Sequence, residues 1–273
     1  MNKIVVGFDF SSGAANAVDL AIDIAVRFAT DLRLVYVMEK KEDEGPIRAE
    51  IERRNAAVAH LLKGINMDYV LRKGNPSEQL AKECEQLNAS LLVVGTHGSA
   101  GFKKGLFGRN NYRTVELSPS PVLLVREDFN FNKKLEHIVL PLDSSDDTRQ
   151  KAGQTALFAK YFGSTIHILG LYTSSSPSIR RVVNNYVAMV ERYLTSQEVA
   201  FVKEFVEVKG NVTTDTLEYA DRVNADLIAI MTEQESSLQN LIMGTFAQQM
   251  ITASRIPVLT VRPKQVLTSS PTK

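Results

Sequence analysis

Short apolar runs alternate with amphipathic stripes along this chain of 273 residues. The run at 4–8, IVVGF, is almost wholly apolar, which is typical of a parallel strand covered on both faces. A stripe at three- and four-residue spacing follows it and comprises Ala14, Ala17, Val18, Ala21, Ile22, Ala25 and Phe28. This spacing predicts a helix with one buried face. A buried strand followed by such a helix is the repeating unit of an α/β fold.

The same alternation continues through the first half of the chain. We expect strands at 4–8, 32–37, 67–71, 91–94 and 122–125. The charged stretch from Glu39 to Arg54 predicts an exposed loop that leads into a helix through His60, and Ser77 is a candidate cap for the helix that runs to Leu87. Parallel neighbours need crossover connections, so the pattern predicts an open, mostly parallel sheet with helices on both faces.

The second half of the chain repeats the first. KIVVGFDFS at 3–11 returns as HIVLPLDSS at 137–145, LLVV at 91–94 as LIAI at 227–230, and PVLLVR at 121–126 as PVLTVR at 257–262. The offsets are 134 to 136 residues and the segments keep their order. We therefore expect an α/β chain of two tandem domains, 1–128 and 135–264, each with a five-stranded parallel sheet.

Composition narrows the classes of function. The 32 Lys and Arg residues nearly balance the 31 Asp and Glu residues, which gives no support for binding to nucleic acid or membrane. No apolar run is long enough to span a bilayer and the first residues do not resemble a signal peptide, so we expect a cytoplasmic protein. The single cysteine, Cys84, fits a reducing compartment and is expected to pack beside Leu80 and Leu87.

A glycine-rich loop, GTHGSAGFKKGLFGR at 95–109, follows the fourth strand. Glycines allow the backbone to approach a ligand closely, and successive amides at the start of a helix attract anions. Lys103, Lys104 and Arg113 add positive charge nearby. The loop is a candidate phosphate site; the alternative is an ordinary strand-to-helix loop with solvated lysines.

Asp9 stands at the carboxyl end of the first strand. Ligands of open α/β sheets lie beyond the carboxyl ends of the strands, where strand order reverses. A carboxylate there can accept hydrogen bonds from a ribose or from an adenine amine. The alternative is that Asp9 or Ser11 only caps the following helix.

Four motifs, taken in order, resemble the universal stress protein family: DFS at 9–11, GNP at 74–76, VGTHG at 94–98 and PVLLV at 121–125. The resemblance covers nearly the whole chain as two tandem domains. It implies the adenine nucleotide alpha hydrolase-like fold with strand order 3-2-1-4-5. In that order strands one and four are neighbours, so Asp9 and the glycine loop would face each other across one crevice.

The resemblance also implies a phosphate site in the first copy. Nucleotide-binding members carry Gly-x2-Gly-x9-Gly followed by Ser or Thr, and Gly95, Gly98 and Gly108 match this spacing. Arg109 stands where the family has the hydroxyl residue. A guanidinium suits phosphate, and its bulk could equally fill the pocket.

By the same resemblance, Asp9 would contact the adenine or the ribose and the backbone at Val37 would contact the adenine. The glycine loop would hold the phosphates of ATP or AMP, with or without Mg²⁺. In the second copy Met231 and Gln234 occupy the first two glycine positions, and Glu233 lies between them. We expect these side chains to crowd and repel phosphate, so that the second copy binds no ATP.

Three functions follow. The first is a stress-response regulator that binds an adenine nucleotide in its first copy and docks on protein partners that the sequence does not identify. The second is an interaction or scaffold protein of the same fold that binds no nucleotide, and the third is a slow ATP hydrolase. We expect no enzyme, because the sequence offers no positioned nucleophile or pair of carboxylates.

The sequence also carries expectations about its histidines and about the pairing of the two copies. His97 is expected to be structural, and His60, His137 and His167 are expected to lie apart without metal-ligand spacing. Family members typically dimerise through their fifth strands, so the resemblance implies an internal pairing of 122–125 with 258–261. The sequence leaves open whether the tandem chain forms a further homodimer.

Overall fold

The computed structural model describes residues 2–38, 42–96, 107–129, 134–232 and 243–263, with the backbone alone at 107–110. The first copy comprises β1 (Ile4–Phe8), α1 (Ser12–Phe28), β2 (Leu32–Met38), α2 (Glu44–Val58), η1 (Ala59–Leu61), β3 (Met67–Lys73), α3 (Pro76–Gln86), β4 (Leu91–Thr96), α4 (Phe107–Leu117) and β5 (Val122–Arg126). The second copy comprises β6 (His137–Leu142), α5 (Ala152–Phe162), β7 (Thr165–Tyr172), α6 (Pro177–Ser196), β8 (Phe201–Glu207), α7 (Val212–Arg222), β9 (Leu227–Met231), α8 (Thr245–Ala253) and β10 (Val258–Val261).

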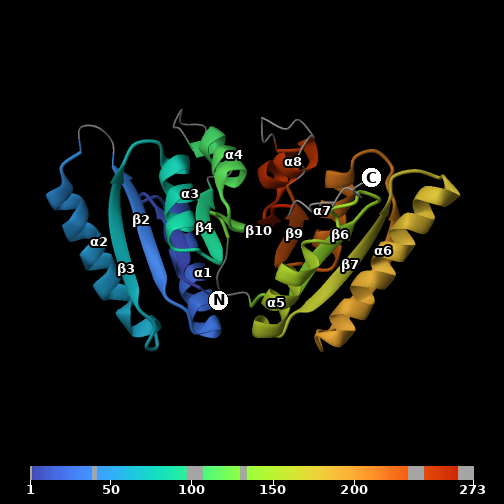
Figure 1. The fold of residues 1–273 in the computed structure, drawn as a ribbon, viewed down its shortest axis with the longest axis horizontal. Helices are drawn as coiled ribbons and strands as arrows, with labels where there is room; N and C mark the ends of the chain where they lie inside the picture. The colour runs from blue at the N-terminus through green and yellow to red at the C-terminus, as the bar shows by residue number, and fades with distance from the viewer. Residues whose placement is uncertain (1, 39–41, 97–106, 130–133, 233–242, 264–273) are drawn as a thin grey trace, which may run out of the picture.

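The strands of the described residues form one ten-stranded sheet in the order β3-β2-β1-β4-β5-β10-β9-β6-β7-β8 (Figure 1). Neighbours within each copy are parallel. β5 and β10 are antiparallel, with Leu123 opposite Leu259. Each copy therefore has the order 3-2-1-4-5, and the two fifth strands join the copies into a single layer.

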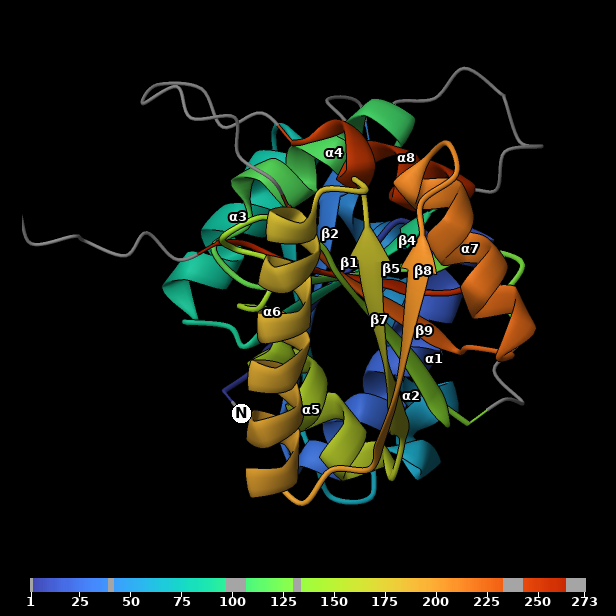
Figure 2. The ribbon, with the colours of Figure 1, turned by 90° about the vertical axis from the view of Figure 1, so that its right-hand side faces the viewer.

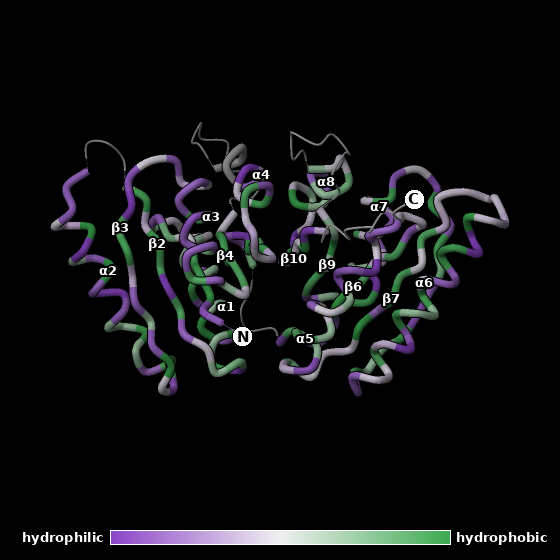
Figure 3. The backbone as a smooth tube through the Cα atoms, in the orientation of Figure 1, coloured by the Kyte–Doolittle hydropathy of each residue, from purple (hydrophilic) through white to green (hydrophobic). Residues whose placement is uncertain are grey.

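Helices cover both faces of the sheet because successive strand residues point to opposite faces. Ile4 and Val6 belong to the core cluster that includes residues of α1, α2, α5 and α6, and Val5 belongs to the cluster that includes residues of α3, α4, α7 and α8. Figure 2 shows α6 and α7 on opposite sides of β7 and β8. In Figure 3 the inner strands carry the apolar colour. None of the helices in the described ranges combines the length and apolar content needed to cross a membrane.

Two local expectations were wrong. α2 already begins at Glu44, within the charged stretch expected to be a loop, and only Ile47 and Ile51 of this helix are buried. α3 is capped by Asn75, whose side chain accepts the N–H of Glu78 at 3.3 Å, rather than by Ser77. The proline at 76 takes the first helical position, where a missing N–H costs nothing, and so places the cap one residue earlier.

The copies also contact each other on both faces of the joined sheet. On one face the hydroxyl of Tyr112 in α4 pairs with the hydroxyl of Thr252 in α8, and Glu116 accepts the N–H of Met243 at 3.2 Å. On the other face the ring of Phe28 in α1 stacks on Tyr161 in α5, with centroids 4.0 Å apart. The pairing of the copies therefore involves helices as well as strands.

Candidate functional site

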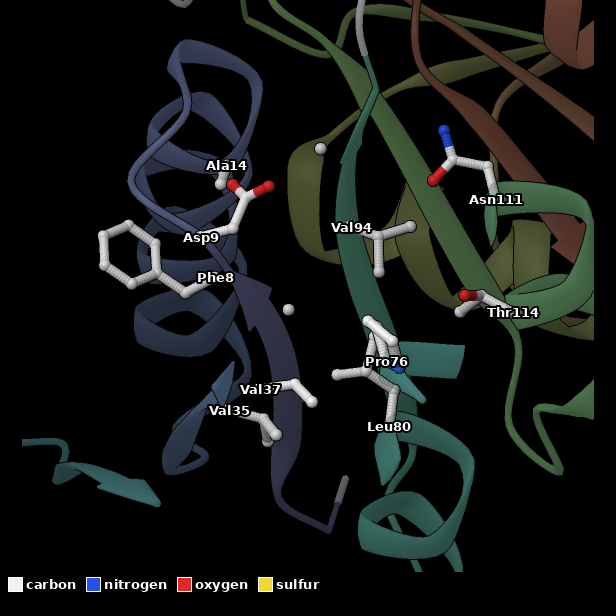
Figure 4. A pocket seen from close by; sticks show the side chains of 12 residues that line it. Phe8, Asp9, Ala14, Val35, Val37, Pro76, Leu80, Val94, Asn111 and Thr114 are labelled. Carbon is white, nitrogen blue, oxygen red and sulfur yellow. The ribbon is translucent and has the colours of Figure 1, made fainter. Parts of the chain in front are cut away.

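A hollow lies at the carboxyl ends of β1, β2 and β4 in the first copy (Figure 4). Its empty volume is about 500 Å³, including space open to solvent. The residues that line it are Gly7, Phe8, Asp9, Ala14, Val35, Val37, Pro76, Leu80, Val94, Gly95, Asn111 and Thr114. Three residues predicted from the sequence, Asp9, Val37 and Gly95, therefore line one site.

Asp9 has two roles in this structure. Its Oδ1 accepts the N–H of Ser11 at 3.1 Å and the Ser11 hydroxyl at 2.6 Å, and the Ser11 hydroxyl oxygen accepts the N–H of Ala14 at 3.1 Å. Asp9 thus fixes the residue that caps α1. Within the described ranges its Oδ2 accepts no hydrogen bond, and the carboxylate lies beside the hollow in Figure 4. The capping and the ligand-binding interpretations of Asp9 are compatible.

The opposite sides of the hollow differ in chemistry. Val35 and Val37 on β2, Leu80 on α3 and Val94 on β4 form an apolar wall. Asn111 and Thr114, which the sequence analysis did not select, face it from α4 (Figure 4). The Thr114 hydroxyl donates to Ser77 at 2.9 Å. Their spacing of three residues places them on one face of a helix, and this was the only sequence signal for them.

Gly95 is required by packing, whatever binds nearby. A Cβ atom on Gly95 would lie 2.2 Å from the carbonyl carbon of Gly13 and 2.4 Å from the amide nitrogen of Ala14. A Cβ on Gly13 would in turn lie 2.9 Å from the carbonyl oxygen of Thr96. The two glycines therefore allow the first turn of α1 to lie directly against the backbone of β4.

The remaining predicted residues are only partly described. Gly98 and His97 lie outside the described residues. α4 begins at Phe107, so Gly108 and Arg109 stand in its first turn, and the Arg109 side chain lies outside the described part. The contact of Arg109 with a phosphate or with the pocket therefore stays a prediction.

The second copy has a hollow at the equivalent position, with an empty volume of about 810 Å³ including open solvent. It is lined by Pro141, Asp143, Ser145, Asp147, Thr148, Lys151, Leu171, Val212, Met231 and Phe246. Oδ1 of Asp143 accepts the N–H of Ser145 at 3.0 Å, as Asp9 does for Ser11. The buried ammonium of Lys151 donates to the Thr148 carbonyl at 2.7 Å. Polar and charged groups thus occupy positions where the first copy has glycine and alanine.

Met231 lines this second hollow, and the crowding of a phosphate by its side chain stays a prediction. Ser12, the first residue of α1, aligns with Asp146 at the offset of 134 residues, whereas α5 begins at Ala152, six residues later. Because α5 begins later, the residues of the second copy that correspond to the first turns of α1 form turns and not helix. The helix therefore does not approach β9 as closely as α1 approaches β4, and space remains beside the Met231 side chain. Gln234 and Glu233 lie outside the described residues.

A family model described as the Universal stress protein family matches residues 1–126 and again residues 134–262. The chain belongs to the universal stress protein family. It carries the family domain twice, in tandem. A universal stress protein of Bacillus subtilis, YxiE, is 28% identical over 148 residues and covers 46% of this chain and 99% of its own length. One from Mycolicibacterium smegmatis is 30% identical over 134 residues, 45% of each chain.

Solved structures agree with the fold over the whole tandem. A universal stress protein from Archaeoglobus fulgidus superposes with a TM-score of 0.76 at 17% identity, covering 96% of this chain and 98% of that one. A putative universal stress protein from Pseudomonas aeruginosa UCBPP-PA14 gives 0.68 at 14% identity, covering 96% and 94%. At these identities the likeness concerns the fold alone.

Two other predicted features of this universal stress protein can be compared with its structure. Burial raises the pKa of the Cys84 thiol to about 12, which keeps it protonated and fits the packing role expected for it. His137 and His167, expected to lie apart, are in contact: His137 Nδ1 is 3.1 Å from His167 Nε2. The expectation was wrong because β6 and β7 are parallel neighbours, which brings residues thirty positions apart side by side.

Proposed function

We propose that this universal stress protein binds an adenine nucleotide, ATP or AMP, in the hollow of its first copy, and that its second copy binds none. The observation that carries the proposal is the meeting of Asp9, Val37 and Gly95 around one hollow, although they come from three separate strand ends. Binding would then alter how the protein docks on its partners in a stress response, which is the regulatory function that its family membership favours.

Each wall of the hollow suits one part of an adenine nucleotide. The free Oδ2 of Asp9 is an acceptor for a ribose hydroxyl or for the adenine amine. Val37 and Leu80 offer apolar surface to the base, and Asn111 adds donors and an acceptor from α4. Main-chain amides after Gly95 would hold the phosphates, with any Mg²⁺ carried by them. The close approach of Gly13 already accounts for the glycine at position 95. The support for nucleotide binding therefore comes mainly from Asp9 and the apolar wall.

The scaffold function without nucleotide has its own support in the same residues. Gly95 and the Oδ1 of Asp9 both serve the packing and capping of α1, roles that need no ligand. A family member that had lost nucleotide binding would keep both. Slow ATP hydrolysis gains no comparable support from the described residues.

Isothermal titration of the full chain with ATP, AMP and GTP separates the two functions. We expect saturable binding of the adenine nucleotides at one per chain, and an increase in melting temperature, since a ligand at about 100 times its Kd adds about 2.7 kcal/mol of stability. Gly98→Asp, which places a carboxylate in the glycine motif, should abolish nucleotide binding. The matched control, Asp143→Ala in the second copy, should bind like the parent protein.

Absence of heat and of any thermal shift at millimolar ATP would exclude the nucleotide function and leave the scaffold. Two nucleotides per chain, or loss of binding in Asp143→Ala, would show that the second copy is also a site. Steady-state phosphate release, measured in the parent and in Gly98→Asp, tests the hydrolase separately.

A further inference from the structure

One face of the first copy is held by a network of groups that are charged at neutral pH. Arg33 on β2 donates to Asp68 at 2.7 Å and to Glu83 at 2.9 Å, Lys3 bonds Asp68 at 2.8 Å, and Arg72 bonds Glu83 at 2.5 Å. Glu83 lies on α3 and its side chain is only 2% exposed. The network therefore fastens α3 to strands of its own sheet through ion pairs.

Three positions of this network carry other residues in the second copy. At the offset of 134 residues Lys3 aligns with His137 and Arg33 with His167, and at the offset of 136 residues Glu83 aligns with Tyr219 on α7. The two imidazoles are 3.1 Å apart, and His167 Nδ1 is 3.3 Å from the Tyr219 hydroxyl. α7 thus contacts the pair through the Tyr219 hydroxyl, which bonds His167, a group whose charge can change near neutral pH.

The neighbours of the pair offer limited compensation for added charge. His167 is 8% exposed. On β8, Glu204 already pairs with Arg222 of α7 at 2.6 Å, and the Arg222 guanidinium lies 4.9 Å from the centre of the Tyr219 ring. Oδ2 of Asp226, before β9, accepts the N–H groups of Glu136 and His137 at 2.8 and 2.9 Å.

The protonation state of the two rings decides whether the contact between His137 and His167 is favourable. Neutral rings, or one neutral and one protonated ring, keep an N–H donor facing a ring-nitrogen acceptor across the 3.1 Å contact. A second proton turns both facing nitrogens into donors and places two positive charges side by side. The doubly protonated pair must therefore separate or remain rare.

We propose that the His137–His167 pair is an acid-sensitive fastening of α7 to the second copy, which loosens when the pair takes up its second proton. Val212, the first residue of α7, lines the second hollow, so loosening would also open that hollow. The network that fastens α3 contains no histidine, because it is made of carboxylates, guanidinium groups and the Lys3 ammonium.

The expected pH window follows from the direction of the shift. Burial, followed by the charge of His137, lowers the pKa of His167 below its ordinary value, although Glu204 raises it. As pH falls, His167 binds a proton in the unfolded chain at a higher pH than in the folded chain. The contribution of the neutral His167 to the free energy of unfolding is therefore complete above about pH 6.5 and is lost as pH falls through the lowered pKa. In the first copy burial alone would raise the pKa of Asp68, but hydrogen bonds from Arg33 and Lys3 lower it, so that contribution is lost only below about pH 4.

Two measurements on the full chain test the proposal. In proton NMR the imidazole of His167, assigned by elimination with His60→Gln, His97→Gln and His137→Gln, should titrate below the ordinary pKa of a histidine, about 6.5. In His137→Gln its midpoint should rise, while the control His60→Gln leaves it unchanged. Hydrogen exchange of the unsubstituted protein should show α7 losing protection between pH 7.5 and 5, by about tenfold per unit of pKa shift after correction for intrinsic rates. α3 serves as the internal control.

A His167 midpoint that is the same in His137→Gln and in the unsubstituted protein would overturn the proposal. So would equal protection of α7 at both pH values, or equal losses in α3 and α7. The exchange experiment needs no variant, so the proposal stays testable even if a substitution prevents folding. Neither measurement uses a nucleotide, and a failure here leaves the proposed function untouched.

Discussion

The two copies form equivalent halves of one sheet, yet α1 begins directly against β4 while α5 begins six residues later along its copy. In the first copy a pair of glycines, Gly13 and Gly95, allows two backbones to meet. In the second copy Asp147 and Met231 occupy these positions, the meeting is lost, and a wider hollow lined by charged groups results. A single backbone contact thus changes both the start of a helix and the shape of a site.

The two copies differ in the same way on the opposite helical layer. α3 is fastened by ion pairs around the buried Glu83, and α7 by a histidine pair and a tyrosine. The helices and strands are equivalent while the chemistry of the contact differs. The two copies thus share the fold, while the residues that hold equivalent helices to the sheet differ.

The largest expected effect comes from giving the first copy the residue of the second copy at the position where α1 meets β4. Gly95→Met should destabilise the first copy by about 3 kcal/mol or more, because any side chain there overlaps the backbone of Gly13. Urea unfolding measures the change. Gly153→Ala is the matched control: a Cβ there meets only the Tyr193 hydroxyl at 3.6 Å, so stability should change by less than about 1 kcal/mol. Equal effects of both substitutions would show that the close approach is not required.

The next effect concerns the charged network. Glu83→Gln should cost about 2 to 3 kcal/mol of unfolding free energy, since it leaves Arg72 without a carboxylate and Arg33 with Asp68 alone near a buried position. Tyr219→Phe at the equivalent position removes one neutral hydroxyl and should cost about 1 kcal/mol. Chemical denaturation of both variants tests the difference, and a larger loss in Tyr219→Phe would contradict it.

A smaller effect is expected on ligand binding. Asp9→Ala should weaken ATP binding by about tenfold, equivalent to about 1.4 kcal/mol, and reduce the preference for adenine over guanine nucleotides. Asp143→Ala should change neither, as measured by titration calorimetry. Circular dichroism controls for the loss of the Ser11 cap, which Asp9 also supports. Parent-like binding by Asp9→Ala would show that this carboxylate does not contact the ligand.

The smallest effect tests the contact between the copies. Tyr161→Ala removes the ring that stacks on Phe28 at 4.0 Å, and Tyr161 is 45% exposed, so we expect a loss of about 1 kcal/mol. The readout is the cooperativity of thermal unfolding, because a weaker contact lets the copies unfold in separate steps. A single unchanged transition would show that the Phe28–Tyr161 contact is not needed to couple the copies.

The amino-acid sequence by itself determined the duplication, the α/β class and the residues at the strand ends. Runs such as Ile4–Phe8 and their echoes depend on local periodicity, which a sequence displays directly. Asp9, Val37 and Gly95 could be selected because strand ends and family motifs mark them, and strand order then placed them around one hollow.

Only the tertiary structure decided which distant residues meet. Parallel pairing joins positions about thirty residues apart, so the contact of His137 with His167 depends on the register of β6 and β7. The requirement for glycine at 95 depends on Gly13 approaching from another element, and the placing of Asn111 and Thr114 depends on how α4 packs. Periodicity shows which face of an element is buried, but not its neighbour, because the neighbour is chosen by the packing of the whole sheet.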